Sequence, residues 1–163
     1  MEINMQIEII CVGKLKEDFW RSACLEYAKR LSRFCHLTIT ELKDEAIPET
    51  ASQAQIDKAL QQEGERIMEK LQPRDYVVSL CVEGKACSSE GLAEKLEQIM
   101  QSGAGRLVFV IGGSCGLSEA VKARSHVKLS FSTMTFPHQL MRVILLEQVY
   151  RAFKINAHES YHK

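Results

Sequence analysis

Two short segments in the last third of the chain carry residues that could bind a small molecule. The first is Gly112-Gly113-Ser114-Cys115-Gly116, which follows the apolar run 108–111. Glycines directly after a buried strand let the backbone turn tightly and approach a ligand closely. The spacing matches neither GxGxxG nor a phosphate-binding loop ending in Lys-Ser/Thr, so it gives weak support to dinucleotide or nucleoside-triphosphate binding. A glycine-rich turn without a ligand is the alternative.

The second segment, residues 130–137, joins a short apolar run to a proline. Its hydroxyl groups and backbone amides could bind the polar parts of a ligand, and its apolar side chains could enclose a moiety such as adenine. A simple N-capping turn before a helix that begins near Pro137 is the alternative. The hydroxyls belong to Ser132, Thr133 and Thr135, and the apolar side chains to Phe131, Met134 and Phe136.

Hydrophobic periodicity predicts the elements that position these segments. Apolar, β-branched runs predict strands, and apolar residues three and four apart predict helices. Their alternation indicates an α/β fold, with a largely parallel sheet and helices on both faces. Such sheets bind small molecules at the carboxyl edge of their strands, where both segments would lie. The predicted strands are 5–13, 37–42, 76–82, 107–111 and 127–131, and the predicted helices are 16–34, 52–71, 88–101, 118–124 and 137–156.

Four of the predicted helices have an apolar face that should point toward the core, and in helix 88–101 this face is Leu92, Leu96 and Ile99. In helix 16–34 this face is Phe19, Ala23, Tyr27, Leu31 and Phe34; in helix 52–71 it is Ile56, Leu60, Ile67, Met68 and Leu71; in helix 137–156 it is Leu140, Val143, Ile144, Gln148 and Ala152.

Length and composition are those of one globular domain, residues 1–163. The 21 basic residues are balanced by 21 acidic ones, so RNA contact would need a local basic patch or one assembled by a dimer. No signal peptide and no apolar run of about 20 residues is present, so we expect a cytoplasmic protein without membrane contact. The six cysteines lack CxxC spacing, so we expect reduced thiols and no metal site.

Segments 129–143 and 147–155 closely resemble the RlmH family, the ribosomal RNA large-subunit methyltransferases H of the SPOUT superfamily. The resemblance runs from Ile10-Cys11-Val12-Gly13-Lys14-Leu15-Lys16 to the ending Tyr161-His162-Lys163. It implies a trefoil knot in the C-terminal half, although knots are rare in proteins. Hydrophobic periodicity cannot reveal such a knot. It also implies bound S-adenosylmethionine, a homodimer, and methylation of N3 of a pseudouridine in the 23S ribosomal RNA of the assembled ribosome.

The resemblance implies the cofactor positions and a C-terminal ending that could contact RNA, whereas residue type and spacing indicate the other candidate RNA contacts. His138 and Arg142, four residues apart on one helix face, and the ending Tyr161-His162 would meet the RNA, where a tyrosine could stack on a base and a histidine could help to remove the N3 proton. Solvated charges, or a disordered tail, are the alternatives. Cofactor positions fall on Leu80, Gly112, Gly113, Phe131, Ser132, Thr133, Met134, Thr135 and Phe136; candidate RNA contacts are Arg151, Lys154 and Lys163, with Lys16, Arg21, Lys29, Arg30 and Arg33 as a second surface.

Two other functions compete with the methyltransferase. A non-catalytic factor that binds RNA or the ribosome could use the same fold, because a fold does not determine a function. The glycine loop and the Ser/Thr-rich loop favour the enzyme, since a pure binding protein does not need that combination. A flavodoxin-like protein would need a phosphate-binding loop after the first strand, and Gly13-Lys14-Leu15-Lys16 matches such a loop poorly.

Overall fold

The computed structural model describes residues 4–163, so the start of the predicted domain, Met1 to Ile3, lies outside the described residues. Strands and helices alternate throughout this part, as predicted. Among the described residues, no helix is long and apolar enough to cross a membrane. The strands are β1 (Gln6–Val12), β2 (His36–Leu42), β3 (Asp75–Ala86), β4 (Arg106–Ile111) and β5 (Val127–Ser130), and the helices are α1 (Asp18–Leu31), α2 (Gln53–Lys70), α3 (Ser89–Gln101), α4 (Glu119–Arg124) and α5 (His138–Asn156).

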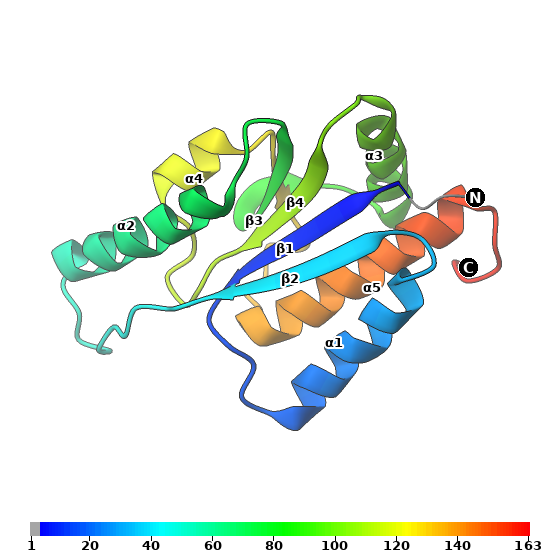
Figure 1. Ribbon diagram of the computed structural model, residues 1–163. Coiled ribbons are helices and arrows are strands. Elements are labelled where there is room, and N and C mark those ends of the chain that lie inside the picture. The colour runs from blue at the N-terminus through cyan, green and yellow to red at the C-terminus, as the bar shows by residue number, and fades with distance from the viewer. Residues whose placement is uncertain (1–3) are drawn as a thin grey trace.

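All five strands form one parallel sheet in the order β2-β1-β4-β3-β5 (Figure 1). Helices α1, α3 and α5 cover one face, and α2 and α4 cover the other. Alternation along β1 serves both layers: Ile7 and Ile9 enter the core beneath α1, α3 and α5, while Ile10 and Val12 enter the core beneath α2 and α4. The predicted parallel sheet with helices on both faces is confirmed.

Strand β3 extends to Ala86, beyond the predicted end at Val82. Its pairing with β5 jumps from Leu80–Leu129 to Lys85–Leu129, so the residues between Leu80 and Lys85 bulge out of the ladder. A Cβ built on Gly84 would lie 2.8 Å from backbone atoms of Lys128 and Leu129, and a glycine is therefore required where β3 passes β5. The bulge places residues 81–83 at the carboxyl edge of the sheet.

Two of the predicted inward side chains are exposed. Phe19 is 63% exposed on α1, whose fully buried residues are Cys24 and Leu31. The predicted face advanced four residues at a time, which drifts by about 40° per step on a helix of 3.6 residues per turn. Met68 is also exposed, because its neighbour Ile67 takes the buried position on α2.

Helix α5 is buried along a different stripe from the predicted one. Ala152 is buried as predicted, but Leu140, Val143, Ile144 and Gln148 are half-buried. The helix lies between α1 and α3, so the face toward the sheet is the one that is covered. The first helical residue is His138, and Pro137 occupies the N-cap position. The fully buried residues of α5 are Arg142, Leu145, Leu146, Val149, Ala152 and Phe153.

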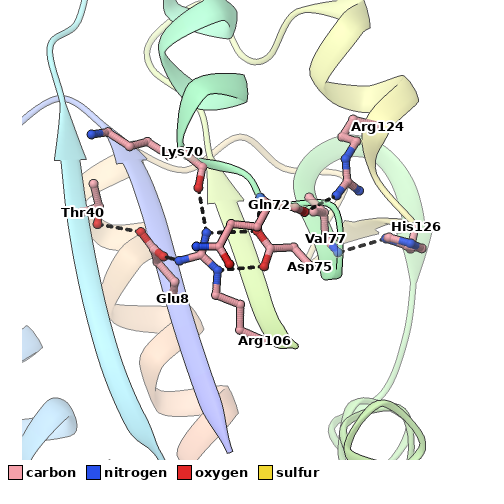
Figure 2. A network of polar contacts seen from close by, with 9 residues as sticks. All are labelled: Glu8, Thr40, Lys70, Gln72, Asp75, Val77, Arg106, Arg124 and His126. Atoms are coloured by element: carbon pink, nitrogen blue, oxygen red, sulfur yellow. Dashed lines mark hydrogen bonds and ion pairs between the residues drawn. The ribbon is translucent and has the colours of Figure 1, made fainter. Parts of the chain in front are cut away.

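A network of ion pairs joins the amino ends of the central strands (Figure 2). Arg106, the first residue of β4, pairs with Glu8 of β1 and donates to both carboxylate oxygens of Asp75 at 2.8 and 3.0 Å. It also donates to the Lys70 carbonyl oxygen at 2.7 Å, while Glu8 accepts from the Thr40 hydroxyl at 2.7 Å. The network therefore ties β1, β2, β3, β4 and the end of α2 together.

Candidate active site

Three segments at the carboxyl edge of the sheet enclose a cavity of about 680 Å³. They are residues 80–83 of β3, the loop 111–117 after β4, and residues drawn from 129–141 after β5. This volume is in the usual range for a small-molecule site. Among the predicted cofactor residues Thr133 does not line the cavity, and the others do: Leu80, Gly112, Gly113, Phe131, Ser132, Met134, Thr135 and Phe136.

The glycine loop is a tight turn that needs its glycines for its own shape. A Cβ on Gly112 would lie 2.3 Å from the Gly116 carbonyl oxygen, which is far too close. The Gly116 N–H donates to the Gly113 carbonyl at 3.1 Å, and Gly116 has a φ of +86°, which favours glycine. Sequence reasoning assigned Gly112 to ligand approach, and the structure adds that this glycine lets the loop fold back on itself.

The loop between β5 and α5 is held by its own serines. The Ser130 hydroxyl donates to the Ser132 carbonyl oxygen at 2.9 Å, and the Ser132 hydroxyl accepts from the Met134 N–H at 3.0 Å. Met134 is 71% exposed at the mouth of the cavity, whereas Phe131 and Phe136 are half-buried. The loop thus presents apolar side chains and backbone polar groups to one space.

His138 stands at the first turn of α5 and lines the cavity. Its Nε2 atom lies close to Gly13, where a Cβ would be 3.6 Å away. Burial lowers the pKa of His138, and the positive charge of Arg142 lowers it further, against the opposing charge of Asp44. The imidazole is therefore neutral near pH 7 and able to accept a proton.

Arg142 is buried rather than displayed on the surface beside His138. Its side chain forms an ion pair with Glu41 at 2.7 Å and donates to the Gly13 carbonyl oxygen at 3.3 Å, and its Nε atom has no hydrogen-bond partner among residues 4–163. Although burial raises it, hydrogen bonds from Arg142 and from the Leu15 N–H hold the pKa of Glu41 below its ordinary value. Arg142 thus braces the loop that faces His138.

The predicted residues of the C-terminal tail lie away from the cavity. The Tyr161 hydroxyl donates to Glu147 at 3.1 Å, and His162 lies between Arg151 at 3.1 Å and Glu90 at 2.6 Å. Burial raises the pKa of Tyr161 to about 12. Within one chain, the 19 residues of α5, about 28 Å of helix, separate this tail from His138.

The candidate RNA-binding cations are largely paired within the chain. Arg151 forms an ion pair with Glu147 at 2.6 Å, and Lys154 forms one with Glu159, whereas Lys163 is exposed. Arg21 and Arg30 on α1 pair with Asp18 and Glu26, and Arg33, just beyond that helix, pairs with Glu159. These three arginines are exposed, as are Lys16, Lys29 and Lys163.

Sequence reasoning missed three residues that surround the site: Gly13, Glu41 and Glu63. Gly13 has a φ of +98° and carries the carbonyl that Arg142 binds. Glu63 is buried on α2 beside the glycine loop. A signal for Glu63 was present, because it stands one turn before Ile67 on the apolar side of an amphipathic helix. In the described part of the chain, no three His, Cys, Asp or Glu side chains are grouped so as to hold a metal ion.

The chain is similar to methyltransferases in sequence and in fold. A family model described as "Predicted SPOUT methyltransferase" matches residues 5–162. A protein of Leuconostoc mesenteroides subsp. mesenteroides, named "Ribosomal RNA large subunit methyltransferase H", is 51% identical over 159 residues, which cover 98% of this chain and 100% of that protein.

Two solved structures share the fold at low sequence identity. A probable methylase family protein from Haemophilus influenzae Rd KW20 has a TM-score of 0.52 at 14% identity, covering 98% of this chain and 70% of its own. A probable methyltransferase from Bordetella pertussis Tohama I has a TM-score of 0.57 at 16% identity, covering 92% of this chain and 97% of its own.

Proposed function

The chain belongs to the SPOUT methyltransferase family, and on that premise we propose that it transfers a methyl group from S-adenosylmethionine to ribosomal RNA of the large subunit. The observation that carries the proposal is the cavity at the carboxyl edge of the sheet, where the glycine loop and the Ser/Thr-rich loop meet. The name of the Leuconostoc relative supports the same substrate.

The residues around the cavity fit this cofactor. Leu80 and Phe131 would supply apolar walls for an adenine ring, and the backbone of the 131–136 loop would supply hydrogen-bonding groups for its edge. The glycine loop lets the backbone approach the rest of the molecule. When bound, S-adenosylmethionine supplies an activated methyl group on its sulfonium.

The protein's own task is then to align the target base and to accept a proton. N3 of a pseudouridine, the target that the family resemblance implies, must lose its proton when it takes the methyl group. His138 lines the cavity, and burial lowers its pKa, so its neutral imidazole is our candidate for the proton acceptor. Arg142 and Glu41 would hold the neighbouring Gly13 loop in place.

We further propose that the protein acts as a homodimer in which the tail of one protomer reaches the cavity of the other. Tyr161 and His162 lie at the opposite end of α5 from His138, so one chain does not bring the predicted catalytic residues together. Helices α1 and α5 contact each other, and both carry apolar side chains that a partner could cover: Phe19 and Leu25 are exposed, and Val143 and Ile144 are half-buried. We also propose that the chain is a single domain with a trefoil knot in its C-terminal half, as the family resemblance implies.

Mixed dimers test the shared site. His138→Ala and Tyr161→Ala variants, each inactive alone, should recover roughly a quarter of wild-type activity when co-refolded, because half of the dimers are mixed and each has one intact site. No recovery, with mixed dimers shown to form, would place both residues in the site of one protomer and reject the shared arrangement.

The function itself is tested by methyl transfer from radiolabelled S-adenosylmethionine to ribosomes, isolated subunits and naked ribosomal RNA, with mass mapping of the product. Label in a pseudouridine of the large-subunit RNA, in assembled ribosomes only, is the expected result. Cofactor binding without transfer would mean that the substrate is wrong. Absence of both would favour a non-catalytic ribosome-binding factor.

A further inference from the structure

Within residues 4–163, Glu63 is a buried carboxylate without a cation paired to it. It is 5% exposed, like the other buried charged residues, but those have partners: Glu8 and Asp75 pair with Arg106, and Arg142 pairs with Glu41. Within residues 4–163, Arg66 is the basic residue whose charge acts on Glu63, and it forms its ion pair with Glu45 instead. An unpaired buried charge is costly, and a bound cation would offset that cost.

The geometry fixes this carboxylate against the cofactor cavity. A Cβ built on Gly113, which lines the cavity, would lie 3.6 Å from each carboxylate oxygen of Glu63. The next residue, Gly64, packs so closely on the N-cap of α4 that a Cβ there would be 2.4 Å from the Ser118 hydroxyl. Helix α2 is therefore pressed onto both ends of the 113–118 segment, with Glu63 directly behind the glycine loop.

Glu63 accepts a hydrogen bond from the backbone but forms no ion pair among the described residues. Its Oε2 atom accepts the Glu45 N–H at 2.8 Å. Burial raises the pKa of Glu63, the Glu45 N–H and Arg66 lower it, and the neighbouring charges of Asp44 and Glu45 raise it. A carboxylate with a perturbed pKa beside a cavity is a candidate functional residue.

We propose that Glu63 is a specificity-determining residue, whose negative charge behind Gly113 favours the positively charged S-adenosylmethionine over its uncharged product, S-adenosylhomocysteine. The proposal rests on the cofactor assignment made above. Loss of the methyl group removes the positive charge on the sulfur and leaves the rest of the molecule unchanged. The two ligands therefore differ mainly in the charge with which Glu63 would interact. The same charge would thus favour departure of the product after each turnover.

Calorimetry with three ligands tests the proposal. Glu63→Gln is nearly isosteric, and its amide oxygen still accepts the Glu45 N–H. In this variant the ratio of the Kd for S-adenosylhomocysteine to the Kd for S-adenosylmethionine should fall about three- to tenfold, as expected for charges several ångströms apart near a protein surface. Sinefungin carries an amine cation in place of the sulfonium. Its affinity for Glu63→Gln should therefore fall together with that of S-adenosylmethionine.

Three further variants separate charge from shape. Glu63→Asp keeps the charge and should keep most of the wild-type ratio. Glu63→Met is a second neutral variant, without the hydrogen bond to Glu45, and should lower the ratio as Glu63→Gln does. Glu65→Gln, at an exposed position on the same helix, is the matched control and should leave the ratio unchanged.

The outcomes separate this proposal from the proposed function. Equal weakening of both ligands in Glu63→Gln would reduce Glu63 to a brace for the glycine loop and overturn the proposal, while the cofactor assignment would stand. A wild-type protein that binds neither ligand would overturn the cofactor assignment itself. Thermal unfolding of each variant establishes that the comparison is made on folded protein.

Discussion

The two edges of the sheet are built from different kinds of interaction. At the amino edge, charged side chains satisfy one another: Arg106 is bound by Glu8, Asp75 and the Lys70 carbonyl (Figure 2). At the carboxyl edge, the cavity is bordered by glycines, short hydroxyl side chains and apolar side chains such as Leu80 and Phe131. One edge is closed to ligands by its own side chains, and the other offers its backbone to them.

This difference separates stability from recognition within one sheet. Breaking a buried ion pair leaves a charge without compensation, so the amino edge should be sensitive to any loss of its partners. The turn at the carboxyl edge needs glycines, because a side chain there would clash with the backbone. Substituting a larger residue for one of these glycines should therefore disrupt the cavity. The predictions below test whether the two edges can be damaged independently.

Removing the central cation of the amino edge should have the largest effect. Arg106→Ala leaves Glu8 and Asp75 buried without their partner, which should cost about 3–5 kcal/mol in the free energy of unfolding and lower Tm by roughly 10 °C. Thermal unfolding measures the loss. Affinity for S-adenosylmethionine, measured below the transition, should stay within about twofold, because the cavity lies at the other edge.

Arg74→Ala is the control for Arg106. This arginine is exposed and donates to the Gly103 carbonyl oxygen, so its removal should change Tm little. An Arg106→Ala protein as stable as Arg74→Ala would show that the network contributes nothing to the amino edge.

Filling the glycine loop should damage the carboxyl edge. Gly112→Val forces a side chain against the Gly116 carbonyl oxygen, 2.3 Å from the new Cβ. Opening that turn should cost about 3 kcal/mol of cofactor affinity, roughly 150-fold in Kd. Calorimetry with S-adenosylmethionine measures it.

Gly103→Asn provides a matched substitution outside the cavity. Gly103 has a positive φ of +76° with open space around it, which asparagine tolerates better than other residues. Retained affinity in Gly112→Val would remove the glycine loop from the cofactor site.

One histidine at each edge sharpens the comparison for catalysis. His138→Asn should lower the rate of methyl transfer about 100-fold, at the low end of what a general base contributes. Since burial lowers the pKa of His138, the wild-type rate should stay constant as pH falls past 6.5 and decline only when pH drops through that lowered value. Single-turnover rates against pH measure both effects.

His126→Asn is the counterpart at the amino edge. His126 accepts the Val77 N–H at 3.0 Å and stacks on Tyr76 with ring centroids 4.5 Å apart, and it does not line the cavity. Its loss should lower Tm and leave the rate of methyl transfer unchanged. A His138→Asn enzyme with the wild-type rate and pH profile would exclude His138 as the proton acceptor.

Local signals sufficed for the elements and for the cofactor loops. Strand and helix periods recur within a few residues, and the two loops follow strands whose carboxyl ends share an edge. The individual cofactor residues were implied by the family resemblance, and eight of those nine residues line the cavity, with Thr133 as the exception.

Contacts between distant parts of the chain were not predictable in this way. Arg142 is buried and pairs with Glu41, which stands 101 residues earlier in the chain. Helical spacing could not reveal this contact and instead placed Arg142 on one surface with His138. Glu63 lies beside Gly113 across about half that length of chain. The tail residues Tyr161 and His162 contact Glu147, Arg151 and Glu90 within the chain, contacts that neither the predicted RNA-binding role nor the alternative of a disordered tail included.

The C-terminal tail tests whether a third region belongs with the stable edge or with the reactive one. Because its pKa is about 12, Tyr161 keeps its proton at neutral pH and donates it to Glu147 in a hydrogen bond, while its ring packs edge-on against Tyr150. Tyr161→Phe removes that hydrogen bond and keeps the ring, so stability should fall by about 1 kcal/mol or less. If the tail reaches the partner's cavity, methyl transfer to ribosomes should fall more than stability does, with the Kd for S-adenosylmethionine unchanged. A Tyr161→Phe protein that is less stable but fully active would show that the tail only stabilises α5. The hydroxyl of Tyr161 would then have no part in RNA recognition.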